Sequence, residues 1–348
     1  MKFSTRSLLL IICLVFAMTS LMACSAPASA PDTSAPAEES KEKVWKIAHI
    51  RPAGAVADVD IRAFAEDVSS RTDGKLKLEV YPASQLGDYT VVQERVAIGD
   101  IEMQVAPIGT NLDKGFGISN APYLVENWEQ ANMVYATGSV LINEMAARLE
   151  KNDIKLLGTY PLYFGGIALG KEPKEPENAE VPKGIKIRVP AMKSFELAAE
   201  ALGYIATPLP WADTFTSFQT GIVEGAIGAG AEGYYSNLKD LMKCYLPLND
   251  HFEMWYIYVN KEKYESLPDD EQKALLEAAQ ALEKKRFTEA EEQEKEYEDK
   301  LAALGITIVE FSDEELAAFA KKCREKVWPE IKGDFGEGLF ETVTKDIK

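Results

Sequence analysis

The 348-residue sequence has little cysteine, little histidine and a deficit of positive charge. Its four cysteines and two histidines form neither a His-Glu-x-x-His nor a Cys-x-x-Cys motif, so no zinc-site spacing is present. The Gly-x-Ser-x-Gly motif of many hydrolases is also absent. With 38 Lys and Arg residues against 56 Asp and Glu residues, the net charge of −18 argues against binding to nucleic-acid phosphates. We therefore expect no metal, no cofactor, no nucleic-acid partner and no enzymatic activity.

Long apolar runs are missing everywhere except near the N-terminus. There, Lys2 and Arg6 precede an almost unbroken apolar run at 8–18, which is typical of an export signal. No later segment reaches the roughly 20 apolar residues that a membrane-spanning helix needs. The sequence therefore predicts an exported chain that does not span the membrane.

The export signal ends in a motif with a second meaning. The sequence LMAC at 21–24 resembles the lipobox of bacterial lipoproteins, which implies a signal peptide at 1–23 and lipidation of Cys24. The alternative is an ordinary cleaved signal followed by a chance cysteine. Residues 24–43, rich in Ser, Ala and Pro and then in charge, predict a flexible tether. We expect an extracytoplasmic protein, at the cell surface or in the periplasm, that is anchored to the cell membrane by its lipid only.

Two cysteines remain in the folded part of the chain. Cys244 and Cys323 could pair in the oxidising exterior. Two buried free thiols are the interpretation that we favour.

The pattern of the rest of the chain is that of an α/β protein. Short β-rich runs alternate with amphipathic helical stretches from residue 44 to about residue 260. Residues 171–184 contain three prolines and predict a surface connection between two lobes. Strands are expected at 44–50, 75–81, 102–108, 154–159, 184–189, 205–207 and 222–227, and helices around 61–68 and at 90–98, 129–151, 194–202 and 212–219.

The C-terminal third has three clear signals. Residues 252–260 form a strongly β-prone run, suited to carry the chain back to the first lobe. Residues 267–304 form one uninterrupted helical pattern, about 55 Å long at 1.5 Å per residue, which exceeds one lobe. Ser312 and Glu315 have the spacing of a capping box and predict the start of a last helix.

Short sequence blocks follow one another in an order that is shared with a known family. They are WKIAH at 45–49, FAEDV at 64–68, YPASQLG at 81–87, GDIEM at 99–103, GIKIRVP at 184–190, TPLP at 207–210 and FQTGIVEG at 218–225. Together, over residues 45–330, they resemble the DctP-type solute-binding proteins that serve tripartite ATP-independent periplasmic (TRAP) transporters.

The resemblance implies a fold and a function. The fold is a two-lobed, periplasmic-binding-protein-like clamp with crossing hinge strands and a long strap helix. Lobe I comprises 44–163 plus 253–290, lobe II comprises 164–252 plus 291–348, and the helix at about 267–304 spans both. The implied function is to bind a small organic acid, a carboxylate, in the interlobe cleft and to deliver it to the membrane subunits of a TRAP permease. A sensory receptor that feeds a signalling partner, and a neutral or aromatic solute, remain open alternatives.

The resemblance also assigns binding residues. Arg188 matches the arginine that grips the ligand carboxylate, and a guanidinium can do so through two charge-assisted hydrogen bonds. Tyr89 matches a position at the cleft wall. Trp211 and Phe215 match cleft-facing aromatic positions, which implies an apolar floor under the ligand.

The chain departs from the family at a glycine-rich run. Many relatives carry an asparagine that binds the carboxylate where this chain has Gly228. Gly228, Gly230 and Gly233 have the form of a dinucleotide fingerprint, but they lie deep in the chain rather than in a first βαβ unit. We interpret the run as a loop that replaces the asparagine. Glu232 could select a ligand hydroxyl or amine, and a solvated loop carboxylate is the alternative.

A second departure concerns the other arginine of some relatives. This chain has Tyr163 near the corresponding position, and we expect Tyr163 to contact the ligand instead. Arg51, near the end of the first strand, and the segment at 251–255 could also reach the cleft. For His251, a structural hydrogen bond to a nearby glutamate is the alternative.

Overall fold

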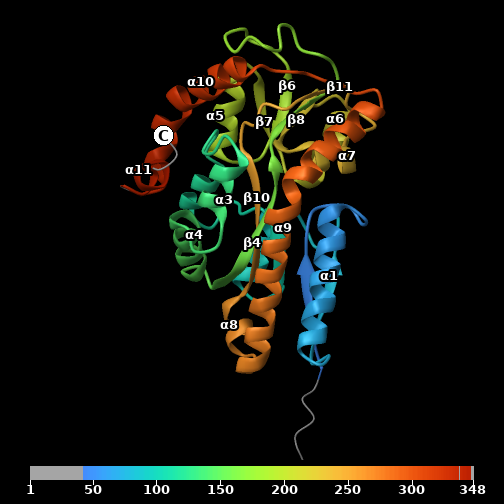
Figure 1. Ribbon diagram of the computed structural model, residues 1–348, viewed down its shortest axis with the longest axis vertical. Helices are drawn as coiled ribbons and strands as arrows, with labels where there is room; N and C mark the ends of the chain where they lie inside the picture. The colour runs from blue at the N-terminus through green and yellow to red at the C-terminus, as the bar shows by residue number, and fades with distance from the viewer. Residues whose placement is uncertain (1–41, 337, 346–348) are drawn as a thin grey trace, which may run out of the picture. The chain divides into compact units, whose positions relative to one another are not determined.

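The computed structural model describes residues 42–336 and 338–345. The predicted signal peptide, the lipidated Cys24 and all but the last two residues of the tether lie outside the described residues. From residue 41 onward the chain forms one compact unit with two β-sheets (Figure 1). In the described residues, no helix combines the length and the apolar character needed to cross a membrane.

The first sheet has five strands in the order β2-β1-β3-β10-β4. Parallel pairing joins β1 to both β2 and β3, whereas β10 runs antiparallel between β3 and β4. Every residue of β10 is buried, as expected for a β-prone strand with a neighbour on each side. The strands are β1 (Lys43–Ala48), β2 (Leu76–Tyr81), β3 (Met103–Ala106), β4 (Ile154–Phe164) and β10 (Phe252–Asn260).

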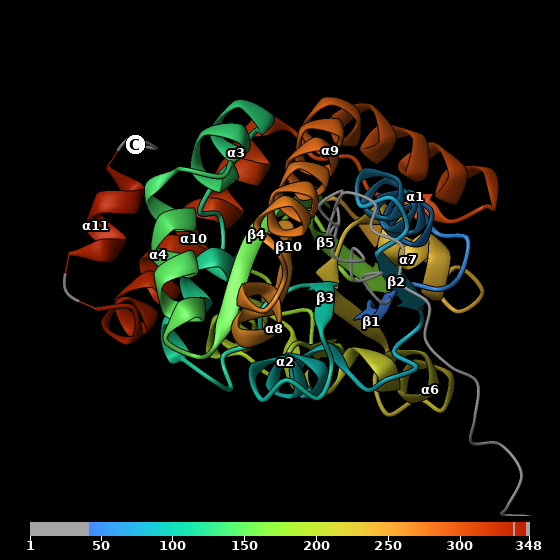
Figure 2. The same cartoon turned by 90° about the horizontal axis from the view of Figure 1, so that it is seen from below.

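Helices cover this first sheet. Figure 2 shows α1 and α4 at opposite sides of it, and α1 packs against β2 while α4 packs against β4. The helices are α1 (Val56–Arg71), α2 (Tyr89–Ala97), α3 (Trp128–Tyr135), α4 (Val140–Glu150), α8 (Lys261–Glu265) and the short 3₁₀ helix η1 (Lys114–Asn120).

The second sheet has six strands in the order β11-β9-β5-β8-β6-β7. Its strands are β5 (Gly166–Leu169), β6 (Lys186–Val189), β7 (Ile205–Pro208), β8 (Gly225–Ala229), β9 (Cys244–Leu246) and β11 (Thr307–Ile308). The helices between them are α5 (Lys193–Ala201), η2 (Trp211–Asp213), α6 (Thr214–Gln219) and α7 (Ala231–Asn237). Two sheets with their own helices confirm the predicted two-lobed α/β clamp.

The chain crosses between the sheets in a confined space. Gly165 alone separates β4 in the first sheet from β5 in the second. A Cβ atom on Gly165 would lie 2.0 Å from Cε1 of His251, and one on Gly166 would lie 2.4 Å from the carbonyl oxygen of Leu246. Only glycine fits at these two positions, because the returning segment passes directly beside the outgoing one.

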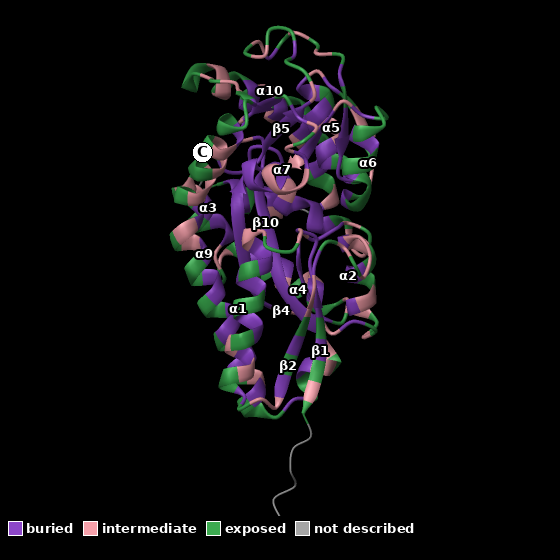
Figure 3. Ribbon diagram, turned by 90° about the vertical axis from the view of Figure 1, so that its right-hand side faces the viewer, coloured by how far each residue is buried: buried purple, intermediate pink, exposed green. Residues whose placement is uncertain are grey.

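The long helix α9 (Asp269–Ala303) ties the sheets together, as predicted. It lies along α1 and β4 of the first lobe and then along α7 and β11 of the second (Figure 1). Its buried stripe includes Leu275, Leu282 and Ala290. Figure 3 shows buried residues concentrated in the strands and exposed residues on the outer faces of α1 and α9.

Two predictions about the elements were wrong. The single helix expected at 129–151 is two helices, α3 and α4, because Gly138 adopts a φ of +94° and Ser139 caps α4 by accepting a hydrogen bond from the Ile142 N–H. The strand expected at 222–227 begins only at Gly225, with a turn before it.

The C-terminal segment also differs from the expectation that 291–348 belongs to lobe II. Helix α10 (Asp313–Ile331) does pack on α5, and its predicted capping box between Ser312 and Glu315 is present. The following 3₁₀ helix η3 (Lys332–Asp334) and helix α11 (Leu339–Thr344) instead pack on η1 and α4 of the first lobe.

The two cysteines of the folded part do not pair. Cys244 on β9 and Cys323 on α10 are buried free thiols, which is the interpretation that the sequence favoured. Burial raises the pKa of both thiols to about 12.

Candidate ligand-binding site

A cavity lies where the two lobes meet. Its volume is only about 30 Å³. A ligand of several heavy atoms can therefore enter only if the lobes move apart. The first lobe contributes residues that follow β1 and β3, the end of η1 and the start of α2; the second contributes residues around β6, α5, η2 and β8; and β10 and the segment before it close the cavity. The lining residues are Ile50, Arg51, Tyr89, Pro107, Asn120, Arg188, Pro190, Met192, Phe195, Trp211, Gly228, His251, Glu253 and Met254.

Arg188 provides a buried positive charge in this lining. Its side chain is 2% exposed, and it is held by protein carbonyls: Nε donates to Leu209 O at 2.9 Å and Nη1 donates to Ile227 O at 3.3 Å. Burial lowers the pKa of Arg188 below its ordinary value. Among the described residues no carboxylate forms an ion pair with it, and its Nη2 makes no hydrogen bond. A buried cation of this kind favours an anionic partner.

Two aromatic side chains lie beside Arg188. The Trp211 ring lies 5.4 Å from Cζ of Arg188 and 5.3 Å from Cζ of Arg51, so the indole is shared by two guanidinium groups. Tyr89 is buried at the start of α2, and its burial raises its pKa to about 12. The Tyr89 hydroxyl is therefore protonated at neutral pH and can donate a hydrogen bond.

The lobes are also joined at this point by a backbone contact. The Ala212 N–H, next to Trp211 in the second lobe, donates to Oδ1 of Asp88, next to Tyr89 in the first lobe, at 3.2 Å. Tyr89 and Trp211 thus sit on segments that are hydrogen-bonded across the cleft.

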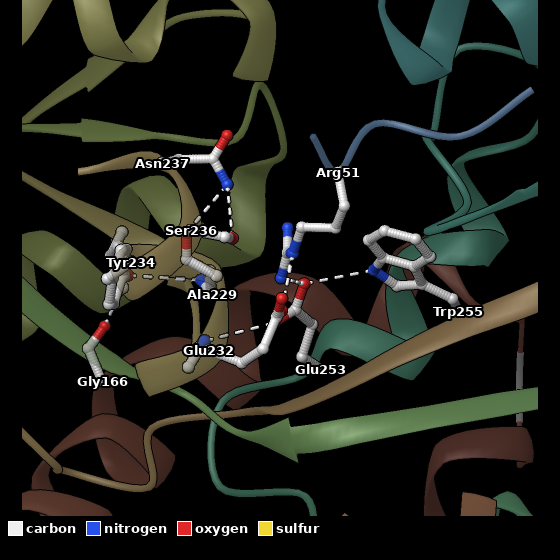
Figure 4. Close-up of polar contacts among 12 residues, drawn as sticks. Arg51, Gly166, Ala229, Glu232, Tyr234, Ser236, Asn237, Glu253 and Trp255 are labelled. Carbon is white, nitrogen blue, oxygen red and sulfur yellow. Dashed lines mark hydrogen bonds and ion pairs between the residues drawn. The ribbon is translucent and has the colours of Figure 1, made fainter. Parts of the chain in front are cut away.

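The second arginine of the lining is already neutralised by the protein. Nε of Arg51 donates to Oε2 of Glu232 at 2.9 Å, and Nη2 donates to Oε1 of Glu253 at 2.7 Å (Figure 4). Glu253 accepts further hydrogen bonds from Trp255 Nε1 and from the Gly230 N–H. Burial alone would lower the pKa of Arg51, but the charges of Glu253 and Glu232 outweigh it and raise the pKa above its ordinary value.

This group of one arginine and two glutamates connects three parts of the fold. Arg51 follows β1, Glu232 belongs to α7 and Glu253 belongs to β10, and all three side chains are buried. We call Arg51, Glu232 and Glu253 the ion triad. With one positive and two negative groups, the ion triad carries a formal net charge of −1, and among the described residues Nη1 of Arg51 has no hydrogen-bond partner.

The imidazole of His251 forms the side of the cavity next to Phe195, whose ring centroid is 4.8 Å away. Nδ1 of His251 lies 2.7 Å from Oδ2 of Asp250. Nε2 is buried and has no partner within the described part of the chain. The histidine therefore makes its structural hydrogen bond with Asp250, and not with the nearby glutamate that the sequence suggested.

Glycine at position 228 leaves room for Arg188. Gly228 has a φ of +107°, and a Cβ atom there would lie 2.7 Å from Cγ of Pro190 and 3.3 Å from Nη1 of Arg188. A side chain would therefore be strained by the backbone and would crowd the guanidinium.

For residues 42–336 and 338–345, no cluster of His, Cys, Asp and Glu has the make-up of a metal site.

Comparison with known proteins identifies the family. The family model described as bacterial extracellular solute-binding protein, family 7 (DctP), matches residues 47–332. The chain belongs to this family.

Relatives of this family 7 solute-binding protein match nearly its full length. It is 24% identical to a solute-binding protein of Roseobacter denitrificans, with 91% of this chain and 97% of the relative covered. It is 25% identical to the ectoine-binding periplasmic protein TeaA of Halomonas elongata, with coverages of 87% and 90%. The crystal structure of the sugar acid binding protein DctPAm of Advenella mimigardefordensis, in complex with galactonate, is similar with a TM-score of 0.80 at 21% identity, over 88% of this chain and 98% of that one. This structural likeness establishes a shared fold.

The cavity of this solute-binding protein contains five of the nine residues that the sequence nominated for the ligand. They are Arg51, Tyr89, Arg188, Trp211 and Gly228.

The other four nominated residues lie outside the cavity lining. Phe215 is 39% exposed on α6, and Tyr163 donates from its hydroxyl to Gln293 on α9. Glu232 pairs with Arg51, and Gly230 donates its N–H to Glu253. The run at 228–233 is the end of β8 followed by α7.

Sequence reasoning overlooked several lining residues. Glu253, Phe195, Met192 and Asn120 carry no motif of their own, and the mention of 251–255 as a segment near the cleft pointed only to Glu253 among them. His251 lies in the same segment, and its pairing with Asp250 could have been suspected from their adjacency in the sequence.

Proposed function

We propose that this family 7 protein is a lipid-anchored extracytoplasmic receptor that binds a small organic acid in the interlobe cavity and delivers it to a TRAP permease. The observation that carries the proposal is Arg188, a 2% exposed guanidinium in the cavity lining with no carboxylate partner among the described residues. A carboxylate ligand would supply the missing counter-charge through two parallel hydrogen bonds.

The ligands named for two similar proteins agree with this chemistry. Ectoine and galactonate, named for the Halomonas and Advenella proteins, both carry a carboxylate. Closure over the ligand follows from contacts made in both lobes at once, since Arg188 belongs to the second lobe and Tyr89 to the first. Ligand binding then stabilises the closed form, which is the form presented to the permease.

The binding step is tested by thermal-shift screening of the unit Lys41–Lys348 against organic acids, amino acids and sugars. A ligand at 100 times its Kd stabilises the protein by about 2.7 kcal/mol. Arg188→Met should weaken carboxylate binding about 30- to 4,000-fold, because truncating one partner of a buried charged pair costs about 2–5 kcal/mol. Arg71→Met, which removes an arginine on α1 far from the cavity lining, is the matched control.

Two results would contradict the proposal. If only neutral solutes stabilise the protein, or if Arg188→Met binds carboxylates as the wild type does, the organic-acid assignment fails. The lipid anchor is tested separately in cells with the full-length chain, where Cys24→Ser should move the protein from the membrane to the soluble fraction.

A further inference from the structure

One acceptor atom in the cavity wall has no partner in the protein. Asp250 faces Nδ1 of His251 at 2.7 Å, and a carboxylate can only accept a hydrogen bond, so the proton lies on Nδ1. In the neutral imidazole this leaves a lone pair on Nε2. The side chain of His251 is 2% exposed, and Nε2 is buried without a hydrogen bond in the part of the chain that the structure describes. Buried acceptors of this kind are normally satisfied, which points to a donor on the bound molecule.

The charges around the cavity limit how many carboxylates a ligand can carry. Arg188 and Arg51 are the arginines of the lining, which contains no lysine. Arg51 pairs with Glu232 and Glu253 through Nε and Nη2, so the ion triad keeps a net negative charge, although Nη1 of Arg51 has no hydrogen-bond partner among the described residues. Arg188 is left to bind one carboxylate. A second carboxylate would face the ion triad without a cation to balance it.

Beside the polar groups of Tyr89, Asn120 and Trp211, five residues of the lining are suited to a compact, apolar body. Ile50, Pro107, Met192, Phe195 and Met254 bring side chains without hydrogen-bonding groups. The charge on Arg188 and the free acceptor on His251 therefore call for at least one anionic group and one hydrogen-bond donor on the ligand.

We propose that the ligand is a compact monocarboxylic acid that carries a hydroxyl or amide N–H, and that Nε2 of His251 accepts this hydrogen while Arg188 binds the carboxylate. The proposal rests on the proposed function and narrows its ligand class. His251 then acts as the specificity-determining residue, and the ion triad excludes dicarboxylates.

The experiment is isothermal titration calorimetry of the unit Lys41–Lys348 with matched pairs of acids that differ by one hydroxyl. The pairs are lactate and propionate, 3-hydroxybutyrate and butyrate, and 2-hydroxyisovalerate and isovalerate; succinate and malate are the dicarboxylates. We expect at least one hydroxy acid to bind tenfold or more tightly than its partner, and both dicarboxylates to bind at least tenfold more weakly than that acid.

Substitutions of His251 test its part. His251→Phe removes the acceptor, so it should reduce the preference for the hydroxy acid to less than threefold and leave the affinity for the hydroxyl-free partner within threefold of the wild type. His251→Gln keeps an acceptor oxygen and should restore part of the preference. If His251→Phe does not fold, the comparison of His251→Gln with the wild type still reports whether the acceptor position sets the preference.

Glu232→Gln tests the charge argument without altering the cavity lining. Removing one negative charge from the ion triad should strengthen succinate binding at least threefold and leave the monocarboxylates unchanged.

The outcomes separate the two proposals. If no carboxylate binds the wild type, or if binding does not need Arg188, the proposed function fails. The present inference is overturned, while the receptor function stands, if carboxylates bind through Arg188 but one of three results is found. These are equal binding of hydroxy and hydroxyl-free acids, tighter binding of dicarboxylates than of the hydroxy acids, or equal weakening of both members of a pair by His251→Phe.

Discussion

Removing Arg51 should destabilise the folded protein far more than removing one of its partners. In the ion triad, Arg51 donates to Glu232 at 2.9 Å and to Glu253 at 2.7 Å. Glu253 would keep hydrogen bonds from Trp255 and Gly230 after an Arg51→Met substitution. Glu232 would keep none from the described residues, because Arg51 is the only partner of Oε2 and Oε1 has none.

The size of the effect follows from the burial of Glu232, whose side chain is 0% exposed. Stranding a buried charge by removing its partner costs about 3–5 kcal/mol. A folded unit of about 300 residues has an unfolding entropy near 0.6 kcal/mol/K, so Arg51→Met should lower the Tm by about 5–8 °C at pH 7.5. Glu232→Gln should lower the free energy of unfolding by less than about 1 kcal/mol, because the Gln carbonyl still accepts from Arg51 and one counter-charge remains.

The assay is thermal unfolding of the unit Lys41–Lys348 at pH 7.5 and pH 5, followed by circular dichroism. The loss in Arg51→Met should shrink at pH 5, because protonation neutralises a stranded carboxylate, and the double variant Arg51→Met/Glu232→Gln should recover more than half of it. Equal losses in Arg51→Met and Glu232→Gln, or a loss in Arg51→Met that is the same at both pH values, would refute the reasoning.

Two other predictions concern buried ionisable groups elsewhere in the fold. Burial raises the pKa of Glu294 on α9 to about 8, although hydrogen bonds from Trp128 Nε1 and the Phe164 N–H oppose this rise. The folded state therefore binds the carboxyl proton of Glu294 more tightly than the unfolded state does. The free energy of unfolding should therefore fall as the pH rises from about 4.5 to 8. Chemical denaturation at pH 5.5 and 8.5 should show that Glu294→Gln reduces this fall by roughly 2–4 kcal/mol. An equal fall in the variant and the wild type would contradict the raised pKa of Glu294. Because Cys244 and Cys323 are buried thiols with raised pKa values, a thiol reagent at pH 8 should modify neither in the native unit and both in denaturant, and rapid native labelling of either would show that it is accessible.

Local physical chemistry was sufficient for the strongest elements. The β-prone run at 252–260 coincides with β10, and the helical pattern at 267–304 corresponds to α9, Asp269–Ala303. The capping box at Ser312 formed as predicted. In each case the pattern is either long or made of directly interacting neighbours, so no distant residue has to be known.

The helix break between α3 and α4 shows where local reasoning was insufficient. Gly138 and Ser139 were visible signals of a helix end and a helix start. The turn is also held by Glu283 of α9, which accepts from the Thr137 N–H at 2.9 Å and from its hydroxyl at 2.6 Å. A partner 146 residues away in the chain stabilises this break, and amphipathic periodicity alone could not reveal it.

For the site, family resemblance was more informative than any single residue type. It directed attention to Arg188, Trp211 and Tyr89, all of which line the cavity. Resemblance was less informative for two residues outside the lining: Tyr163, where this chain departs from its relatives, and Phe215, which matches a cleft-facing position but is exposed on α6.

The sequence by itself determined the α/β class and the long helix, because these depend on periodicity and on local capping. Its resemblance to a family added the two-lobed organisation and the arginine suited to a carboxylate. Only the tertiary structure decided the electrostatics of the cavity. Arg51 and its partners are 181 and 202 residues apart, and their meeting depends on how the ends of β1, α7 and β10 are packed. A charge that is free in the sequence can be paired in the fold, as Arg51 is with Glu232 and Glu253, whereas no carboxylate among the described residues pairs with Arg188.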